Sequence, residues 1–184
     1  MEDRALQSIG KTQTGVQTDY RSQTKSTETF IKIGDVTAAL GTHEGFVDYV
    51  QYYSLDFTMN KSMNPDAHNK LYSSGTVTMS NVRVVTTNHQ QVPILYQKLI
   101  TGDKVDKIET ARTENTEGGT LRPIEKMTFT DCYITGLDYE GDKVVMYFRA
   151  LKFQMDKMPT KQTGEQEGVI TAGYDATTNK LLGA

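Results

Sequence analysis

The sequence has few of the residues on which catalysis, metal binding and disulfide bonding depend. It contains one cysteine, Cys132, three histidines and no tryptophan among 184 residues. A single cysteine excludes an internal disulfide framework and favours folding in a reducing cytosol. No run of about 18 apolar residues is present, so a membrane-spanning helix is not expected. The polar residues 1–29 also lack the apolar core of a signal peptide.

Charge is low and nearly balanced, whereas strand-favouring residues are abundant. The net charge is −3 and the pI is about 5.6, so neither nucleic acid nor an anionic membrane is expected as a partner. Thr, Val, Ile, Tyr and Phe make up 64 of the 184 residues. This composition predicts a mainly β protein, and the length suits one domain.

The chain divides into a polar start and a patterned remainder. We expect residues 1–28 to be a flexible N-terminal extension, because they hold too little apolar surface to offset their ordering entropy. An arm that orders on a neighbouring subunit is the alternative. Residues 29–184 form the expected domain, with a bulge where the alternation shifts at Ser80–Asn81. Strands are expected at 30–33, 46–59, 76–86, 107–114, 122–137, 143–155 and 169–174.

One helix is predicted at Val92–Thr101. Pro93 suits its first turn, and Gly102 suits the left-handed residue that follows the last turn. The helix is short, so it must dock its apolar face on a sheet. A barrel or sandwich of two sheets with this helix is therefore the expected fold. The apolar face consists of Val92, Leu95, Tyr96 and Leu99.

No residues are arranged as a catalytic, metal or cofactor site requires. His43, His68 and His89 lie far apart in the sequence without the spacing of metal ligands. Cys132 lies within a predicted strand and is expected to be a buried structural thiol. Carboxylates such as Glu114 are expected on solvated turns and strand edges. The sequence therefore argues against an enzyme, and no catalytic residue, metal ligand or cofactor is assigned.

A tyrosine cluster is the one aromatic feature that could serve binding. Successive strand residues face opposite sides, so at least one of Tyr52 and Tyr53 should point away from the core of the domain. Core packing with a solvated hydroxyl is one interpretation. The other is that Tyr52 and Tyr53 are aromatics of a subunit interface.

Five segments in order resemble Hcp, the tube protein of bacterial type VI secretion. FIKIGDV at 30–36 and THEGFVDYV at 42–50 resemble the opening of that family, and VPILYQKLITGDKV at 92–105 resembles its single helix. A hairpin over residues 125–153 is similar to its last long hairpin. AGYDATTN at 172–179 resembles its closing strand, so the resemblance covers about residues 29 to 180.

This resemblance implies a fold and a function. The fold would be an Hcp-like β-barrel related to phage tail-tube proteins. The function would be that of a structural subunit: homohexameric rings stack inside a contractile sheath, and the tube is expelled with a spike protein. Effector proteins are the implied cargo of the lumen. The subunit would lie in the bacterial cytoplasm before firing and then be secreted. A phage-type tail-tube protein and a monomeric β-sandwich binding module remain the alternatives.

The polar stretch at residues 60–70 is expected to be a loop outside the core. In the resembled family the long loop between early strands reaches the neighbouring ring. By its position, this stretch is the candidate inter-ring loop. Its residues are Asn60, Lys61, Ser62, Met63, Asn64, Pro65, Asp66 and His68.

Overall fold

The computed structural model describes residues 27–61, 64–65, 71–72, 76–116, 119–160 and 165–182. At 64–65 and 71–72 only the backbone is described. Residues 1–26 of the predicted extension lie outside this part of the chain, and the next two, Thr27 and Glu28, already belong to the first strand.

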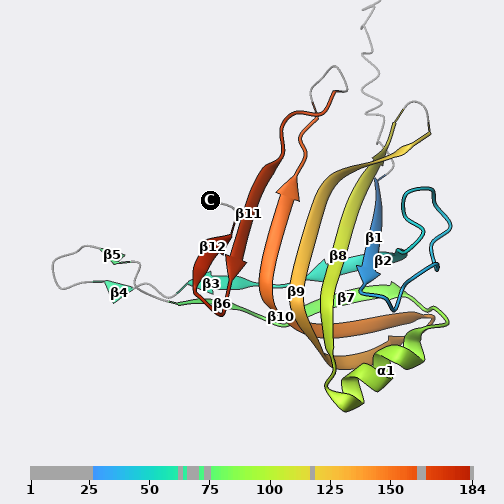
Figure 1. Ribbon diagram of the computed structural model, residues 1–184, viewed down its shortest axis with the longest axis horizontal. Helices are drawn as coiled ribbons and strands as arrows, with labels where there is room; N and C mark the ends of the chain where they lie inside the picture. Colours follow the sequence, from blue (N-terminus) through green and yellow to red (C-terminus); the bar gives the residue numbers. More distant parts are fainter. Residues whose placement is uncertain are drawn as a thin grey trace, which may run out of the picture.

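Twelve strands and one helix make up this part of the chain (Figure 1). The helix, α1, has the predicted bounds, Val92–Thr101. The strands are β1 (Thr27–Ile33), β2 (Val50–Asp56), β3 (Met59–Lys61), β4 (Asn64–Pro65), β5 (Leu71–Tyr72), β6 (Val77–Met79), β7 (Val82–Thr87), β8 (Lys104–Asn115), β9 (Leu121–Glu140), β10 (Lys143–Lys157), β11 (Ile170–Asp175) and β12 (Lys180–Leu182).

Six of the strands close into a barrel. Residues 143–148 of β10 pair antiparallel with β7 on one side and with β9 on the other. The remaining order runs from β7 through β2, β1 and β8 back to β9. A closed barrel leaves no strand edge unpaired around its wall. The prediction of a mainly β barrel with one helix is confirmed.

Beyond the barrel the same sheet is open. Residues 152–157 of β10 pair with β11 in place of β7, and β12 pairs with the other side of β11. The long strands therefore continue above the barrel as a curved sheet that does not close (Figure 1). We call this part the open sheet: residues 110–115 of β8, 121–129 of β9 and 152–157 of β10, together with β11 and β12.

The barrel interior is filled by aromatic and branched side chains. The ring of Phe129 lies 5.2 Å from that of Phe148 and 5.6 Å from that of Phe57, both in edge-to-face geometry. Phe57 comes from the segment between β2 and β3 and also contacts Phe153, at 5.0 Å. Such edge-to-face contacts between aromatic rings stabilise the fold by more than the burial of their apolar surface alone. Phe57 thus covers the inner face where the barrel passes into the open sheet.

Helix α1 packs against β9 and ends as its sequence predicts. Val92 and Leu95 are buried, and Leu99 is half-buried. Gly102 adopts a left-handed conformation, and its N–H donates to the carbonyl of Lys98 at 3.0 Å. In the described part of the chain, no helix has the length and apolar character needed to cross a membrane.

The segment before β2 is a loop, although residues 46–59 were expected to be one continuous strand. Phe46 lies in this loop and stacks on Phe30 at 4.7 Å, on the outside of the barrel. The carboxylate of Asp48 accepts bonds from the Lys32 ammonium at 2.8 Å and from the Ala39 N–H at 3.1 Å. These local bonds hold the loop against β1. Phe46 and Tyr49 therefore form a small second core with Phe30.

The expected strand at 76–86 is two strands. β6 and β7 are separated at Ser80–Asn81, where the alternation changes phase. β6 pairs with β3 in a separate hairpin, and β7 belongs to the barrel. The phase change was correctly located, but it marks a change of sheet and not a bulge.

Two side chains attach the β3–β6 hairpin to the β11–β12 hairpin. The hydroxyl of buried Tyr174 lies 3.0 Å from the Val77 carbonyl oxygen and 2.7 Å from Oδ1 of Asn179. Asn179 Oδ1 also lies 3.5 Å from the Val77 N–H. Both backbone groups of Val77 thus face side chains from a distant part of the chain.

Truncation of the helix should show which leucine is anchored in the core. We expect Leu95→Ala to lower the free energy of unfolding by about 2–4 kcal/mol, because a buried side chain leaves a cavity. Half-buried Leu99→Ala should cost less. Ile100→Ala is the matched control, because Ile100 is 81 % exposed and should change stability by less than about 0.5 kcal/mol. Urea unfolding of the three variants measures these losses of stability. Equal losses in all three would contradict the assignment of Leu95 to the buried face of the helix.

Removal of the Tyr174 hydroxyl should loosen the attachment at Val77. We expect Tyr174→Phe to lower the free energy of unfolding by about 1 kcal/mol and to speed hydrogen exchange in β6. Tyr139→Phe, at an exposed tyrosine, serves as the control. Unchanged exchange in β6 would mean that the hydroxyl does not hold the hairpin.

Candidate assembly surface

Tyr52 lies in the core of the barrel itself. It is 9 % exposed, and the hydroxyl of Thr29 donates to its backbone carbonyl. Burial raises the pKa of the Tyr52 phenol, against the opposing effect of a side-chain hydrogen bond with Thr110. The side chain is occupied by contacts within the subunit, so of the two predicted interface aromatics Tyr52 is not accessible to a partner.

Tyr53 lies on the outer face and is accessible. It is 54 % exposed, and the ammonium of Lys143 lies 4.1 Å from the centre of its ring. A cation over an aromatic face is an attractive contact even at the surface. Strand alternation, which predicted that one of the pair would face outward, therefore selects Tyr53. Its role at a subunit interface stays a prediction.

The candidate inter-ring loop is described only in part. Asn60 and Lys61 belong to β3, which pairs with β6, so they are not loop residues as expected. The backbones of Asn64 and Pro65 form β4 and pair with β5. A proline is compatible with such a short strand at an edge. Ser62, Met63, Asp66 and His68 lie outside the described residues.

The inner face of the open sheet is built in rows that run across neighbouring strands. The innermost row is Ile108, Phe129, Phe153 and Tyr174, all buried. The next row outward is Thr110, Met127, Met155 and Ala172, in which the methionines are half-buried. The outermost row is Arg112, Glu125, Lys157 and Ile170. From the barrel toward the outermost row, burial falls and charged residues appear; we call this outer end of the open sheet the mouth.

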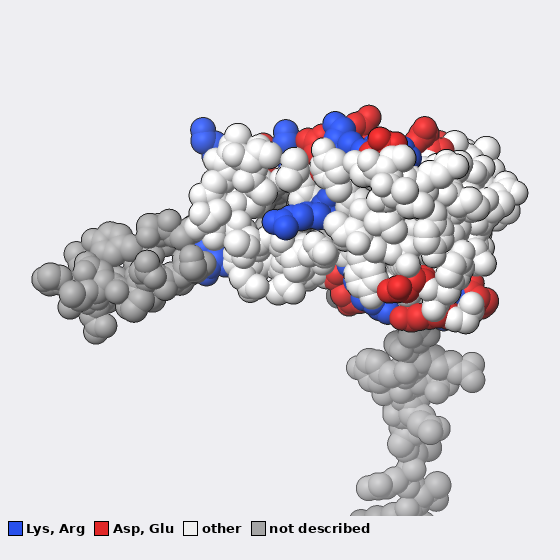
Figure 2. Space-filling view, turned by 90° about the horizontal axis from the view of Figure 1, so that it is seen from below, with Lys and Arg blue, Asp and Glu red and all other residues white. Residues whose placement is uncertain are grey.

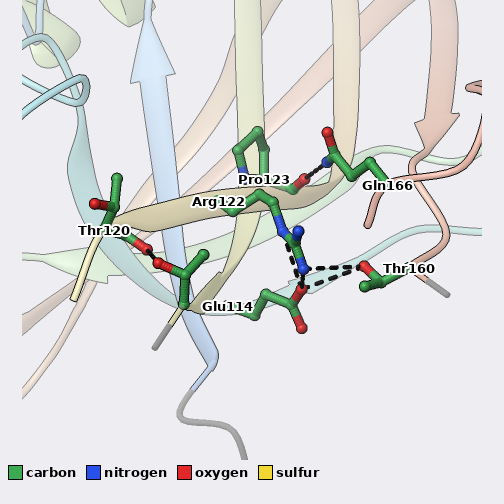
Figure 3. Close-up of polar contacts among 7 residues, drawn as sticks. Glu114, Thr120, Arg122, Pro123, Thr160 and Gln166 are labelled. Atoms are coloured by element: carbon green, nitrogen blue, oxygen red, sulfur yellow. Dashed lines mark hydrogen bonds and ion pairs between the residues drawn. The ribbon is translucent and has the colours of Figure 1, made fainter. Parts of the chain in front are cut away.

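The carboxylates near the mouth are buried and paired. Glu125 accepts a bond from the Lys157 ammonium. Glu114 accepts from the guanidinium of Arg122 and, at 3.2 Å, from the Thr160 hydroxyl (Figure 3). A buried carboxylate is costly unless it is paired and hydrogen-bonded. Glu114 was expected on a solvated edge, and that expectation is wrong.

Hydrogen bonds to the β8–β9 hairpin hold the described residues after β10 in place. The N–H of Met158 donates to the Ile124 carbonyl at 2.9 Å, and the Gln166 amide donates to the Pro123 carbonyl at 2.9 Å. Thr160 pairs with Gln166 as an isolated bridge. In Figure 3, Thr160 and Gln166 come from one segment and face Glu114, Arg122 and Pro123 on the β8–β9 hairpin. These contacts anchor both sides of the mouth to each other.

A groove of about 370 Å³ lies beside these ion pairs. Its walls combine apolar side chains, Ile124, Met158 and Ile170, with the paired charges. The exposed Arg112, on the strand of Glu114, also lines this groove.

The opposite end of the molecule presents a different surface. Figure 2 views the barrel from below: a basic group lies near the middle of that face, and most of the surface around it is uncharged. Basic and acidic side chains gather along two of its margins. A sparsely charged centre with a charged rim is the usual composition of a protein–protein contact.

The residues considered for chemistry do not form a reactive group. Cys132 is buried, and burial raises the pKa of its thiol to about 12. Burial also lowers the pKa of His89. Within the described ranges, no three His, Cys, Asp or Glu side chains are placed to hold a metal ion.

Sequence reasoning missed the charged pairs at the mouth, although a signal was present. Glu114 and Arg122 lie on either side of a hairpin turn and pair directly across it. Opposite charges at facing positions of two strands stabilise an antiparallel pair. Glu114 and Arg122 can be identified as partners only from the register of β8 against β9. The alternation of apolar and polar residues does not give that register.

Comparison with known proteins places this fold in a family. The family model described as type VI secretion system effector, Hcp, matches residues 30–167. A search of curated protein sequences finds no significant match. Similar solved structures do exist, and their low sequence identity makes them evidence of fold.

A structure described as that of a type six secretion system protein covers 85 % of this chain and 100 % of its own, at 16 % identity and a TM-score of 0.74. Hcp1 from Salmonella typhimurium covers 85 % of this chain and 99 % of its own, at 17 % identity and a TM-score of 0.66. A type VI secretion system effector from Yersinia pestis covers 80 % and 98 %, at 17 % identity and a TM-score of 0.60. With the family model matching most of the sequence, the chain belongs to the Hcp family of the type VI secretion system.

Proposed function

We propose that this chain is the structural subunit of a type VI secretion tube. Six copies form a ring, and rings stack into a tube inside a contractile sheath. The tube leaves the cell with a spike protein at its tip and carries effector proteins in its lumen. The subunit resides in the bacterial cytoplasm until firing and acts by assembly, without chemistry of its own.

Family membership is the observation that carries this proposal. The match over residues 30–167 includes the barrel except for the first three residues of β1, and the parts of the open sheet that belong to β8, β9 and β10; β11 and β12 lie beyond it. Members of this family are tube or effector-type proteins of type VI secretion. The surfaces described above agree with a role in assembly, because they offer extended sheet and sparsely charged faces in place of a reactive cleft.

The geometry suits a ring for a physical reason. The open sheet and the outer edge of β12 expose backbone and apolar groups that a barrel normally hides, and exposed edges promote uncontrolled association. A closed ring covers such surfaces on every subunit at once, because its contacts are heterologous and its rotation returns to the start. Tyr53, beside Lys143, is a second surface that we assign to such a contact.

Native mass spectrometry tests the ring. We expect the purified chain to assemble at six times the subunit mass of 20.6 kDa. Sedimentation of only stable monomers at high concentration would contradict the proposal and favour the monomeric binding module. Hexamers and tubes whose release from cells does not require the secretion sheath would instead favour a phage-type tail tube.

Shortening the candidate inter-ring loop tests stacking separately from ring formation. We expect a Gly-Ser link in place of residues 63–68 to leave the hexamer and its melting temperature nearly unchanged, because surface loops tolerate change. Tube length in electron micrographs and secretion should both fall, because contacts between rings are lost. Unchanged tube length and secretion would show that the segment is a passive connector.

A further inference from the structure

Two of the three histidines line one groove, which we call the histidine groove. It has a volume of about 430 Å³. Residues 40–43, from the loop between β1 and β2, line it with His43, and residues 87–90, which join β7 to α1, line it with His89. Two segments that are distant in the sequence therefore meet here through titratable side chains.

The ring of His89 is buried without a compensating contact. Both of its nitrogens are shielded from solvent, and among the described residues neither has a hydrogen-bond partner. Burial lowers the pKa of His89, because a charged ring loses more on leaving water than a neutral one. A buried polar group without a partner is costly, and a buried cation without one is far more so. The fold therefore accepts the neutral form of this ring.

The charges around the groove do not favour a protonated His89. The described residues that line the groove with it include two titratable side chains, His43 and Tyr49. Burial raises the pKa of the Tyr49 phenol, so the phenol is uncharged near neutral pH. Thr87, at the end of β7, pairs with Lys143 of β10, which is a cation. At neutral pH none of these neighbours is an anion.

Helix α1 begins directly after the segment that carries His89. The carbonyl of His89 accepts the N–H of Val92 at 3.1 Å. Neither a side-chain cap nor an acidic residue in the first turn supplies negative charge there. The N-terminal end of a helix carries partial positive charge, so a cation beside it is unfavourable. Protonation of His89 would therefore disturb the start of the helix as well as the groove.

His43 responds to acid in the opposite sense. Its Nε2 lies 3.6 Å from Oε2 of Glu28, a buried oxygen without a hydrogen-bond partner among the described residues. The ring of His43 also meets that of Phe30 edge-to-face at 5.3 Å. A protonated His43 is attracted to the Glu28 carboxylate and stays attached to β1. Acid therefore holds one side of the groove in place and releases the other.

We propose that the histidine groove is an acid-sensitive joint between the loop at residues 40–43 and the segment that leads into α1. With His89 neutral, the two sides stay together and support the first turn of the helix. Protonation of His89 places a cation without a counter-charge in the joint, so the segment that carries His89 moves away from the loop. The joint acts within one subunit and does not depend on the proposed ring.

The direction of the pH effect follows from the two states of His89. In the closed joint its pKa is lowered, and in the open joint the ring is solvated, with an ordinary pKa of about 6.5. The stability that the closed joint gains from a neutral His89 is therefore complete above pH of about 6.5 and is lost as the pH falls below that value. At pH 5.5 protonation favours the open joint by a factor of about ten.

Hydrogen exchange at the start of α1 tests the joint. We expect the amide of Val92 to exchange about tenfold faster at pH 5.5 than at pH 7.5, after correction for the intrinsic pH dependence of exchange, because opening releases its bond to His89. The amide of Gly102, which donates to Lys98 at the other end of the same helix, is the internal control and should not accelerate. Mass spectrometry of peptides from the two ends of the helix distinguishes these amides.

Substitution of each histidine separates the two sides of the groove. His89→Gln keeps a polar side chain that does not titrate, so the acceleration at Val92 should disappear. His43→Gln is the matched control, because His89 still titrates in it and the acceleration should remain. Exchange of the imidazole C2 proton in the wild-type chain is an independent measurement, and in it His89 should titrate below pH of about 6.5.

Every outcome supports or overturns the joint. Loss of the acceleration in His89→Gln, with His43→Gln unaffected, supports it. Equal acceleration in His89→Gln and the wild type, or none in the wild type, overturns it. If His89→Gln does not fold, the wild-type titration decides, because a His89 that titrates at or above its ordinary pKa contradicts a neutral ring in the closed joint. A chain that stays monomeric would overturn the proposed ring and leave this test unchanged.

Discussion

The division of β10 between two neighbours is the constraint on which the rest of this structure depends. Its first half pairs with β7 and closes the barrel, and its second half pairs with β11 and leaves the sheet open. β9 accompanies both halves on the other side, with a register shift next to Phe148. One strand therefore belongs both to the closed barrel and to the open sheet, and any change in its register would disturb both.

The charged pairs at the mouth have a structural role that their position explains. Glu114 with Arg122, and Glu125 with Lys157, join strands where apolar burial has ended. Ion pairs contribute little at a fully solvated surface and can be costly in a dry interior. At this intermediate depth, with Thr160 as an additional donor, they fix geometry where packing alone would not.

The sequence predicts local structure here better than long-range pairing. Helix Val92–Thr101 follows from its apolar period, its early proline and Gly102, all of which act within a few residues. The loop containing Phe46 was misread as strand, because the partner of that ring, Phe30, lies on the outside of the barrel, where alternation predicts solvent. Likewise the burial of Glu114 depends on Arg122 and Thr160, which only register and tertiary folding bring together. For the candidate site, the alternation of strand residues predicts that one of the two tyrosines faces outward. It does not predict that part of the sheet stays open.

The place of β1 in the barrel has a consequence for how the protein is made. β1 forms seven cross-strand pairs with β8, including Ile33 with Ile108, but only two with its sequence neighbour β2. β1 must therefore wait for a strand synthesised long afterwards, and β7 must wait for β10. Such non-local pairing slows folding, into the range of about milliseconds to seconds for β-rich domains. The barrel therefore cannot close before β10, which completes its wall against β7 and β9, has been synthesised.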